Sequence, residues 1–211
     1  MTALPTDITV VLDRSGSMGG MRREAIEAFN EFLGEQRGVD GEATISMVQF
    51  NHEIERTFEG VEIDDVVELG RADYRPRGMT ALLDAMGDAI TRTRGRRQAG
   101  EDAQVVIVVI TDGKENSSRE YTLGDIRELV ERYESEHGWR FVFLAADLDS
   151  VRASRGMGIK SERAFVMGRG GDAHKRSVDL VAKKMAMMRQ KNDIDELDFQ
   201  DEERRRHSEG Q

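Results

Sequence analysis

The chain has 211 residues, of which 38% are hydrophobic and 34% charged, and its formal net charge is −10. A chain of this length can bury a full core in one large domain. Because it contains no cysteine, disulfides and thiolate metal sites are excluded. The 4 histidines are scattered along the chain, so any metal ion would have to be held by oxygen atoms.

The charge also limits the classes of partner. A net negative protein is poorly suited to nucleic acid and to anionic membranes. The basic stretch 91–98 ("TRTRGRRQ") is therefore expected to be the solvated end of a helix. No apolar run approaches the roughly 18 residues that span a bilayer, and the N-terminus carries no basic or apolar leader. We expect a cytoplasmic protein, a monomer or weak oligomer, without nucleic-acid or membrane partners.

The first third of the chain predicts strand, helix and hairpin in turn. Residues 8–13 predict a fully buried strand, because apolar side chains fall on both faces. The apolar residues of segment 21–36 recur at helical spacing. Residues 43–50 and 53–63 predict two strands joined by a tight turn, which makes a hairpin. The polar segment 64–79 is expected to be irregular, since it contains proline and glycine.

The rest of the chain continues this alternation of helix and strand. Six consecutive β-branched residues, 105–110, are typical of the central strand of a parallel sheet. A helix is expected to begin at Thr80, whose hydroxyl can cap it. The other expected elements are a helix at 122–137, strands at 140–147 and 163–167, and a helix at 173–190.

This order predicts an α/β fold of the doubly wound, Rossmann-like kind. We expect a mostly parallel central sheet with one antiparallel edge strand from the hairpin, and helices on both faces. Residues 1–190 are expected to form the domain. Residues 191–211 are acidic, with little to bury, and are expected to form a flexible or weakly helical tail. A further hypothesis is that its carboxylates compete with a partner for a metal site of the domain.

In such folds a ligand binds beyond the carboxyl ends of the parallel strands, near the point where the strand order reverses. The segment "DRSGSMGG" follows the first strand and provides Asp13, Ser15 and Ser17. Asp112 follows the central strand, and Thr80 is presented by the loop before the next helix. Asp147, after a later strand, is expected to have a capping or surface role.

The chemistry of this cluster excludes several common sites. The segment after the first strand has no lysine for a phosphate-binding loop, no Gly-x-Ser-x-Gly nucleophile elbow and no dinucleotide fingerprint. A hard divalent cation remains, since Mg²⁺ prefers six oxygen ligands at about 2.1 Å. Carboxylates of Asp13 and Asp112 and hydroxyls of Ser15, Ser17 and Thr80 offer five donors. Mn²⁺ or Ca²⁺ can accept the same ligands.

Three stretches of the chain resemble the metal-ion-dependent adhesion site of the von Willebrand factor A domain family. They are "DRSGSMGG", the threonine of "RGMTALLDA" and the aspartate of "VVITDGKEN", and the resemblance covers roughly residues 6–190. It implies that Asp13, Ser15, Ser17 and Thr80 bind the metal directly, and that Asp112 often acts through water. It further implies a non-catalytic module whose metal is completed by an aspartate or glutamate of a protein partner. Cytoplasmic members often work with AAA+ or MoxR-type ATPases.

Two alternatives stay open at this point. One is a metal-dependent phosphoryl hydrolase that uses Asp13, although Ser15 stands where aspartyl phosphatases carry a second aspartate. The other is a purely structural role, in which Asp13 caps the helix that begins near Met21.

Overall fold

The computed structural model describes residues 3–97, 102–112, 114–167 and 171–203. Its sheet has six strands in the order β3-β2-β1-β4-β5-β6. Strand β1 pairs in parallel with β2 and β4, whereas β3 is an antiparallel edge strand beside β2. The predicted fold class is therefore confirmed. The strands are β1 Thr6–Asp13, β2 Ala43–Phe50, β3 Ile54–Glu62, β4 Gln104–Thr111, β5 Arg140–Ala145 and β6 Ala164–Val166.

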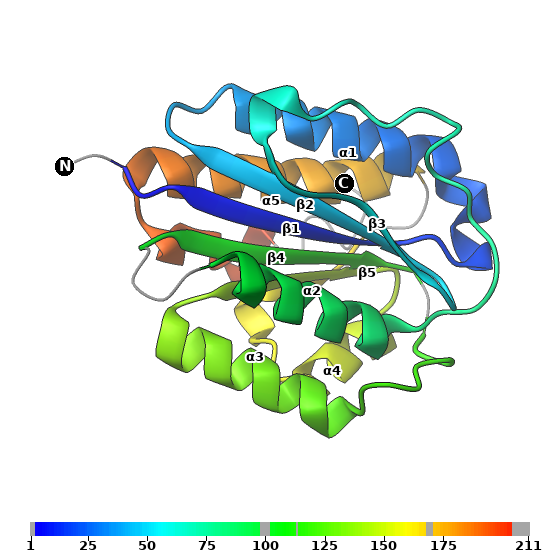
Figure 1. Cartoon of the computed structure of the whole chain (residues 1–211). Helices are drawn as coiled ribbons and strands as arrows, with labels where there is room; N and C mark the ends of the chain where they lie inside the picture. Colours follow the sequence, from blue (N-terminus) through cyan, green and yellow to red (C-terminus); the bar gives the residue numbers. More distant parts are fainter. Residues whose placement is uncertain (1–2, 98–101, 113, 168–170, 204–211) are drawn as a thin grey trace.

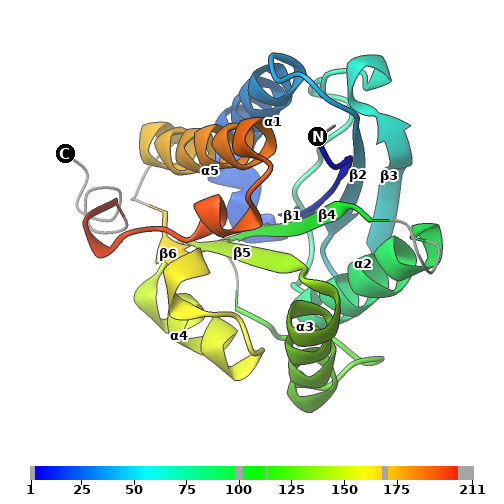
Figure 2. The same cartoon turned by 90° about the vertical axis from the view of Figure 1, so that its left-hand side faces the viewer.

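Helices cover both faces of this sheet (Figure 1, Figure 2). Helices α1 and α5 lie on one face, and α2, α3 and α4 lie on the other (Figure 2). Among the described residues, no helix is both long and apolar enough to cross a bilayer. The helices are α1 Arg22–Arg37, α2 Leu82–Arg96, α3 Leu123–His137, α4 Leu148–Gly156 and α5 Gly171–Lys191.

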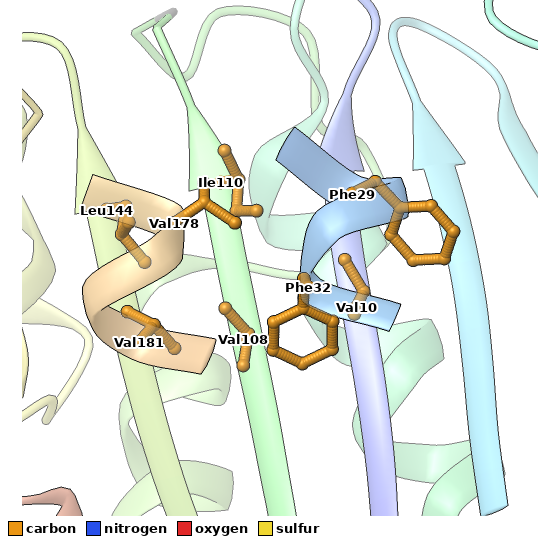
Figure 3. Close-up of a pocket in the computed structure, with 8 residues that line it drawn as sticks. All are labelled: Val10, Phe29, Phe32, Val108, Ile110, Leu144, Val178 and Val181. Atoms are coloured by element: carbon orange, nitrogen blue, oxygen red, sulfur yellow. The ribbon is translucent and has the colours of Figure 1, made fainter. Parts of the chain in front are cut away.

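The sheet separates two hydrophobic cores, because alternate residues of each buried strand point to opposite faces. All eight residues of β1 and all eight of β4 are buried, which confirms the buried strands predicted from residues 8–13 and 105–110. Beneath α1 and α5 the packing leaves an apolar cavity of only about 10 Å³ (Figure 3). It lies between Phe29 and Phe32 of α1, Val178 and Val181 of α5, and the strand residues Val10 and Val108. This face of the sheet is therefore close-packed.

The sequence pattern did not predict one of the helices. The segment Leu148–Gly156 forms α4, although it contains few apolar residues. Its start is fixed by Asp147, whose carboxylate accepts a hydrogen bond from the Ser150 main-chain N–H at 2.8 Å. Asp147 thus has the capping role that was expected of it. Its pKa lies below the usual value, chiefly because of that main-chain hydrogen bond.

The C-terminal segment differs from the expected flexible tail. Leu197 and Phe199 are buried, and the ring of Phe199 packs against Phe165 at 4.9 Å between centroids. The fully buried Arg163 forms ion pairs with Glu134 at 2.7 Å and Asp198 at 2.5 Å. Packing therefore continues past residue 190, because two apolar side chains and one buried guanidinium hold the segment. Residues 204–211 of the expected tail lie outside the described residues.

The tail carboxylates are engaged away from the carboxyl ends of the strands. Asp195 pairs with Arg140, the first residue of β5, at 2.6 Å. Asp198 pairs with Arg163, which immediately precedes β6. Both contacts lie at the amino ends of parallel strands, so they give no support to competition for a metal site in the same chain.

The basic stretch is engaged in ion pairs within the domain. Arg96 and Arg97 donate to the fully buried carboxylate of Asp7 at 3.2 and 3.1 Å, respectively. Arg92 pairs with Glu59 at 3.2 Å. Residue 98, the last of the stretch, lies outside the described part of the chain. These arginines serve the fold, which agrees with the expected helix end.

Candidate metal centre

The ends of β1 and β4 meet where the strand order reverses. Strand β2, the next in the chain, pairs with one edge of β1, and β4 pairs with the opposite edge of β1. The register Leu12↔Ile110 brings the following residues, Asp13 and Thr111, next to each other. The Thr111 hydroxyl donates to Asp13 Oδ2 at 2.6 Å. This is the position at which doubly wound sheets bind ligands.

Four of the five predicted ligands form one hydrogen-bonded group there. The Ser15 main-chain N–H donates to Asp13 Oδ1 at 2.6 Å. The Ser15 and Ser17 hydroxyl oxygens lie 3.0 Å apart, and the Ser17 hydroxyl donates to Asp112 Oδ1 at 2.7 Å. The Ser17 hydroxyl therefore joins the loop after β1 to Asp112, the first residue after β4.

Asp13 is fully buried and does not cap a helix. Helix α1 has Met21 at its N-cap position and no side-chain hydrogen bond there. Below Asp13, the hydroxyl of Tyr74 donates to the Asp13 main-chain carbonyl. Burial raises the pKa of Tyr74, so its phenol stays a protonated donor. Tyr74 and Thr111 thus support Asp13, although the sequence pattern did not single them out.

The loop that carries Thr80 lies directly against the loop after β1. The Arg77 N–H donates to the Arg14 carbonyl at 2.8 Å, and the Gly16 N–H donates to the Gly78 carbonyl at 3.0 Å. Gly78 has φ +75°, and a Cβ there would lie 2.2 Å from Nδ1 of His52. Only glycine therefore allows this approach. Thr80 follows two residues later and is buried.

Thr80 does not cap α2, so that expectation was wrong. The helix begins at Leu82 with Ala81 at the N-cap position and no side-chain cap from it. Instead, the Glu115 carboxylate accepts from the Leu83 N–H at 3.0 Å, and the Ser118 hydroxyl accepts from the Asp84 N–H at 3.1 Å. Because a distant loop satisfies these donors, Thr80 is left available for another role.

The electrostatics of the site favour a cation. Asp112 is half-buried, and its pKa is raised mainly by burial and further by the Asp13 carboxylate, while the Ser17 hydrogen bond opposes the rise. Within the part of the chain that the structure describes, no lysine, arginine or histidine forms an ion pair with Asp112. A divalent ion between the two carboxylates would relieve their repulsion.

The spacing of the donors fits a small divalent ion. An octahedron with metal–oxygen bonds of about 2.1 Å has edges of about 3.0 Å. The Ser15–Ser17 and Ser17–Asp112 oxygen separations are 3.0 and 2.7 Å. Among the described residues there is no cluster of three or more histidine, aspartate or glutamate side chains that could hold a metal. A centre here would depend on serine and threonine hydroxyls.

Comparison with solved structures identifies relatives of the same fold. Proximal thread matrix protein 1 from the mussel byssus, solved with a zinc-occupied MIDAS motif (metal-ion-dependent adhesion site), is 19% identical with a TM-score of 0.60. The match covers 87% of this chain and 46% of that one. The von Willebrand factor domain of the type V pili tip protein Mfa5 from Porphyromonas gingivalis is 12% identical, with a TM-score of 0.63 over 90% of this chain and 98% of that one.

Manganese-loaded TRAP from Plasmodium vivax is 14% identical, with a TM-score of 0.52 over 69% of this chain and 58% of that one. The chain spans less than half the length of the mussel protein. No curated protein sequence matches it significantly. The family model described as von Willebrand factor type A domain matches residues 7–174, and the chain therefore belongs to that family.

Proposed function

We propose that the protein is a non-catalytic, divalent-cation-dependent protein-binding module. Asp13, Ser15, Ser17 and Thr80 would hold Mg²⁺ directly, and Asp112 would hold it directly or through water. Mn²⁺ and Ca²⁺ suit the same oxygen donors. When bound, the ion supplies a Lewis-acidic position that an aspartate or glutamate of a protein partner can occupy.

The observation that carries the proposal is the continuous hydrogen-bonded group of Asp13, Ser15, Ser17 and Asp112. Hydroxyls carry no charge, so these ligands satisfy a divalent ion only in part, and a further carboxylate is attracted. The zinc-occupied motif of the mussel protein and the manganese-loaded parasite protein support a divalent ion in this fold. The pili tip protein Mfa5 and a pilus adhesin of the same fold support a protein partner.

The surface beside the site suits a protein partner. Met79, next to Thr80, is 52% exposed. A pocket of about 210 Å³ lies beside the site. Its lining includes Lys114, two residues after Asp112, and the apolar side chains of Leu82, Phe143 and Met157. Leu82, Phe143 and Met157 are themselves buried, so of these apolar groups the exposed Met79 is the one that a protein partner could cover.

Metal binding can be tested through stability. At one hundred times its dissociation constant, Mg²⁺ should stabilise the folded chain by about 2.7 kcal/mol and raise its Tm by about 5–11 °C. Ser17→Ala and Thr80→Ala should remove most of this rise, whereas Ser135→Ala on the exposed face of α3 should keep it. A wild-type Tm that responds to neither Mg²⁺ nor Mn²⁺ would count against the site.

Partner binding needs a separate experiment. Affinity capture from native lysate, with and without EDTA, should enrich a partner for wild type in Mg²⁺ but not for Thr80→Ala. Capture that is identical in EDTA would contradict metal bridging. An AAA+ or MoxR-type ATPase partner and a cytoplasmic location stay predictions. The alternative of a phosphoryl hydrolase predicts turnover of a generic phosphate ester that disappears in Asp13→Asn.

A further inference from the structure

Side-chain hydrogen bonds connect the segment 115–121, which follows β4, to the first turn of α2. Glu115 accepts from the Leu83 N–H at 3.0 Å. Asp84, in the first turn of α2, accepts from three main-chain N–H groups of the same segment. These belong to Arg119, Glu120 and Tyr121, at 2.8, 2.9 and 2.9 Å. Residues 115–121 and the helix that follows Thr80 therefore form one connected unit.

Within this unit, Asn116 holds Thr80 directly. The Thr80 N–H donates to Asn116 Oδ1 at 2.9 Å. In return the Thr80 carbonyl accepts from the main-chain N–H groups of Asn116 at 3.0 Å and Ser117 at 3.2 Å. Both main-chain polar groups of Thr80 thus find their partners in residues 116 and 117.

Thr80 has no regular secondary structure to hold it. It lies after the irregular loop and before the first residue of α2. The direction of its side chain is set by its main chain, whose N–H is held by the Asn116 side chain and whose carbonyl is held by the main chain of Asn116 and Ser117. The next residue, Ala81, donates to the Asn51 carbonyl at 2.7 Å. A metal ligand has to be held within about 0.5 Å of its productive position. The Asn116 side chain is the group outside the proposed ligand set that meets this need most directly.

We propose that Asn116 is a positioning residue of the metal centre: its side-chain oxygen fixes the main chain of Thr80, and thereby the Thr80 hydroxyl relative to Asp112. This inference rests on the proposed function. Asn116 acts through Thr80 and carries no charge of its own. Since Asn116 is exposed, its truncation leaves no core cavity and the fold should survive.

Two neighbouring substitutions separate this role from general loop packing. Asn116→Asp keeps an oxygen acceptor for the Thr80 N–H, so it should retain the contact. Ser117→Ala keeps the Ser117 main-chain hydrogen bond and removes a hydroxyl that meets no partner among the described residues. Only Asn116→Ala removes the side-chain acceptor of Thr80.

The test measures the Mn²⁺ and Mg²⁺ dissociation constants of the full chain by calorimetry. Asn116→Ala should weaken metal binding about three- to tenfold, the effect of one lost hydrogen bond. For Asn116→Asp and Ser117→Ala, the dissociation constants should be no more than twofold higher than those of wild type. In a Thr80→Ala background, adding Asn116→Ala should cause no further loss, because the residue acts through Thr80.

Hydrogen exchange of the Thr80 amide gives a readout that needs no metal. Exchange should accelerate in Asn116→Ala and stay slow in Asn116→Asp. The positioning role is overturned if wild type binds metal and Asn116→Ala binds it equally well. It is also overturned if Asn116→Ala weakens metal binding by the same factor in the Thr80→Ala background as in wild type. If wild type binds neither ion, the proposed function fails, and amide exchange alone decides: acceleration in Asn116→Ala supports the positioning of Thr80, and unchanged exchange overturns it.

Discussion

Replacing Asp84 by alanine should destabilise the protein more than any substitution of a surface acid on the same helix. Asp84 is only 8% exposed, and its two carboxylate oxygens accept three main-chain hydrogen bonds at 2.8–2.9 Å. A hydrogen bond to a charged group contributes about 1.5–3 kcal/mol. The donor residues Arg119 and Glu120 are exposed, so water replaces part of this loss. We expect a net cost of about 2–4 kcal/mol.

Urea unfolding followed by circular dichroism measures this cost, and thermal unfolding should show a Tm lower by about 4–16 °C. The matched control is Asp88→Ala, one turn further along α2. The Asp88 side chain is 15% exposed, but its partners Arg56 and Arg92 are 42% and 41% exposed, so water screens both ion pairs. Such pairs contribute about 0–1 kcal/mol. Equal destabilisation by the two substitutions would refute the reasoning, because it would mean that the three main-chain contacts contribute no more than a surface ion pair.

Three further predictions follow from buried or strained positions. Burial lowers the pKa of His174 to about 4. Between pH about 6.5 and about 4, the unfolded chain binds a proton at His174 that the folded chain does not bind. The free energy of unfolding should therefore fall by about 3 kcal/mol on acidification to pH 4. Urea titrations at each pH should show this fall for wild type and a smaller one for His174→Gln. Gly78→Ala should cost about 1–3 kcal/mol because its φ is positive and His52 is in contact, whereas Gly19→Ala, with open space around it, should be nearly neutral by the same urea assay. Arg163→Met should cost about 3 kcal/mol in thermal and urea unfolding, because it removes the closer cationic partner of the largely buried Glu134 carboxylate and leaves only Lys160 at 3.9 Å. A loss below about 1 kcal/mol would contradict this account.

The sequence alone determined the class of fold and the succession of the main strands along the chain. Within β1 and β4, residues 8–12 and 105–110 carry apolar side chains on both faces, with Thr9 as the exception, and a strand covered by helices on both sides of a sheet accommodates such runs. The placement of Asp13 and Asp112 followed from the same rule, because parallel strands end at one edge. A hydrophobic pattern of this kind depends only on residues that are close in the sequence, so it predicts a strand without knowledge of distant contacts.

Tertiary structure alone decided how the loops are held. Glu115 and Ser118 cap α2, so Thr80 is free of the capping role that its position before a helix had indicated. Asn116 contacts Thr80 across 36 positions of sequence. Likewise, the C-terminal segment is fixed by Arg163, a residue whose charge gives no local sign of burial. These contacts join residues far apart in the chain, and only the packing of the helices and loops around the sheet brings them within hydrogen-bond distance.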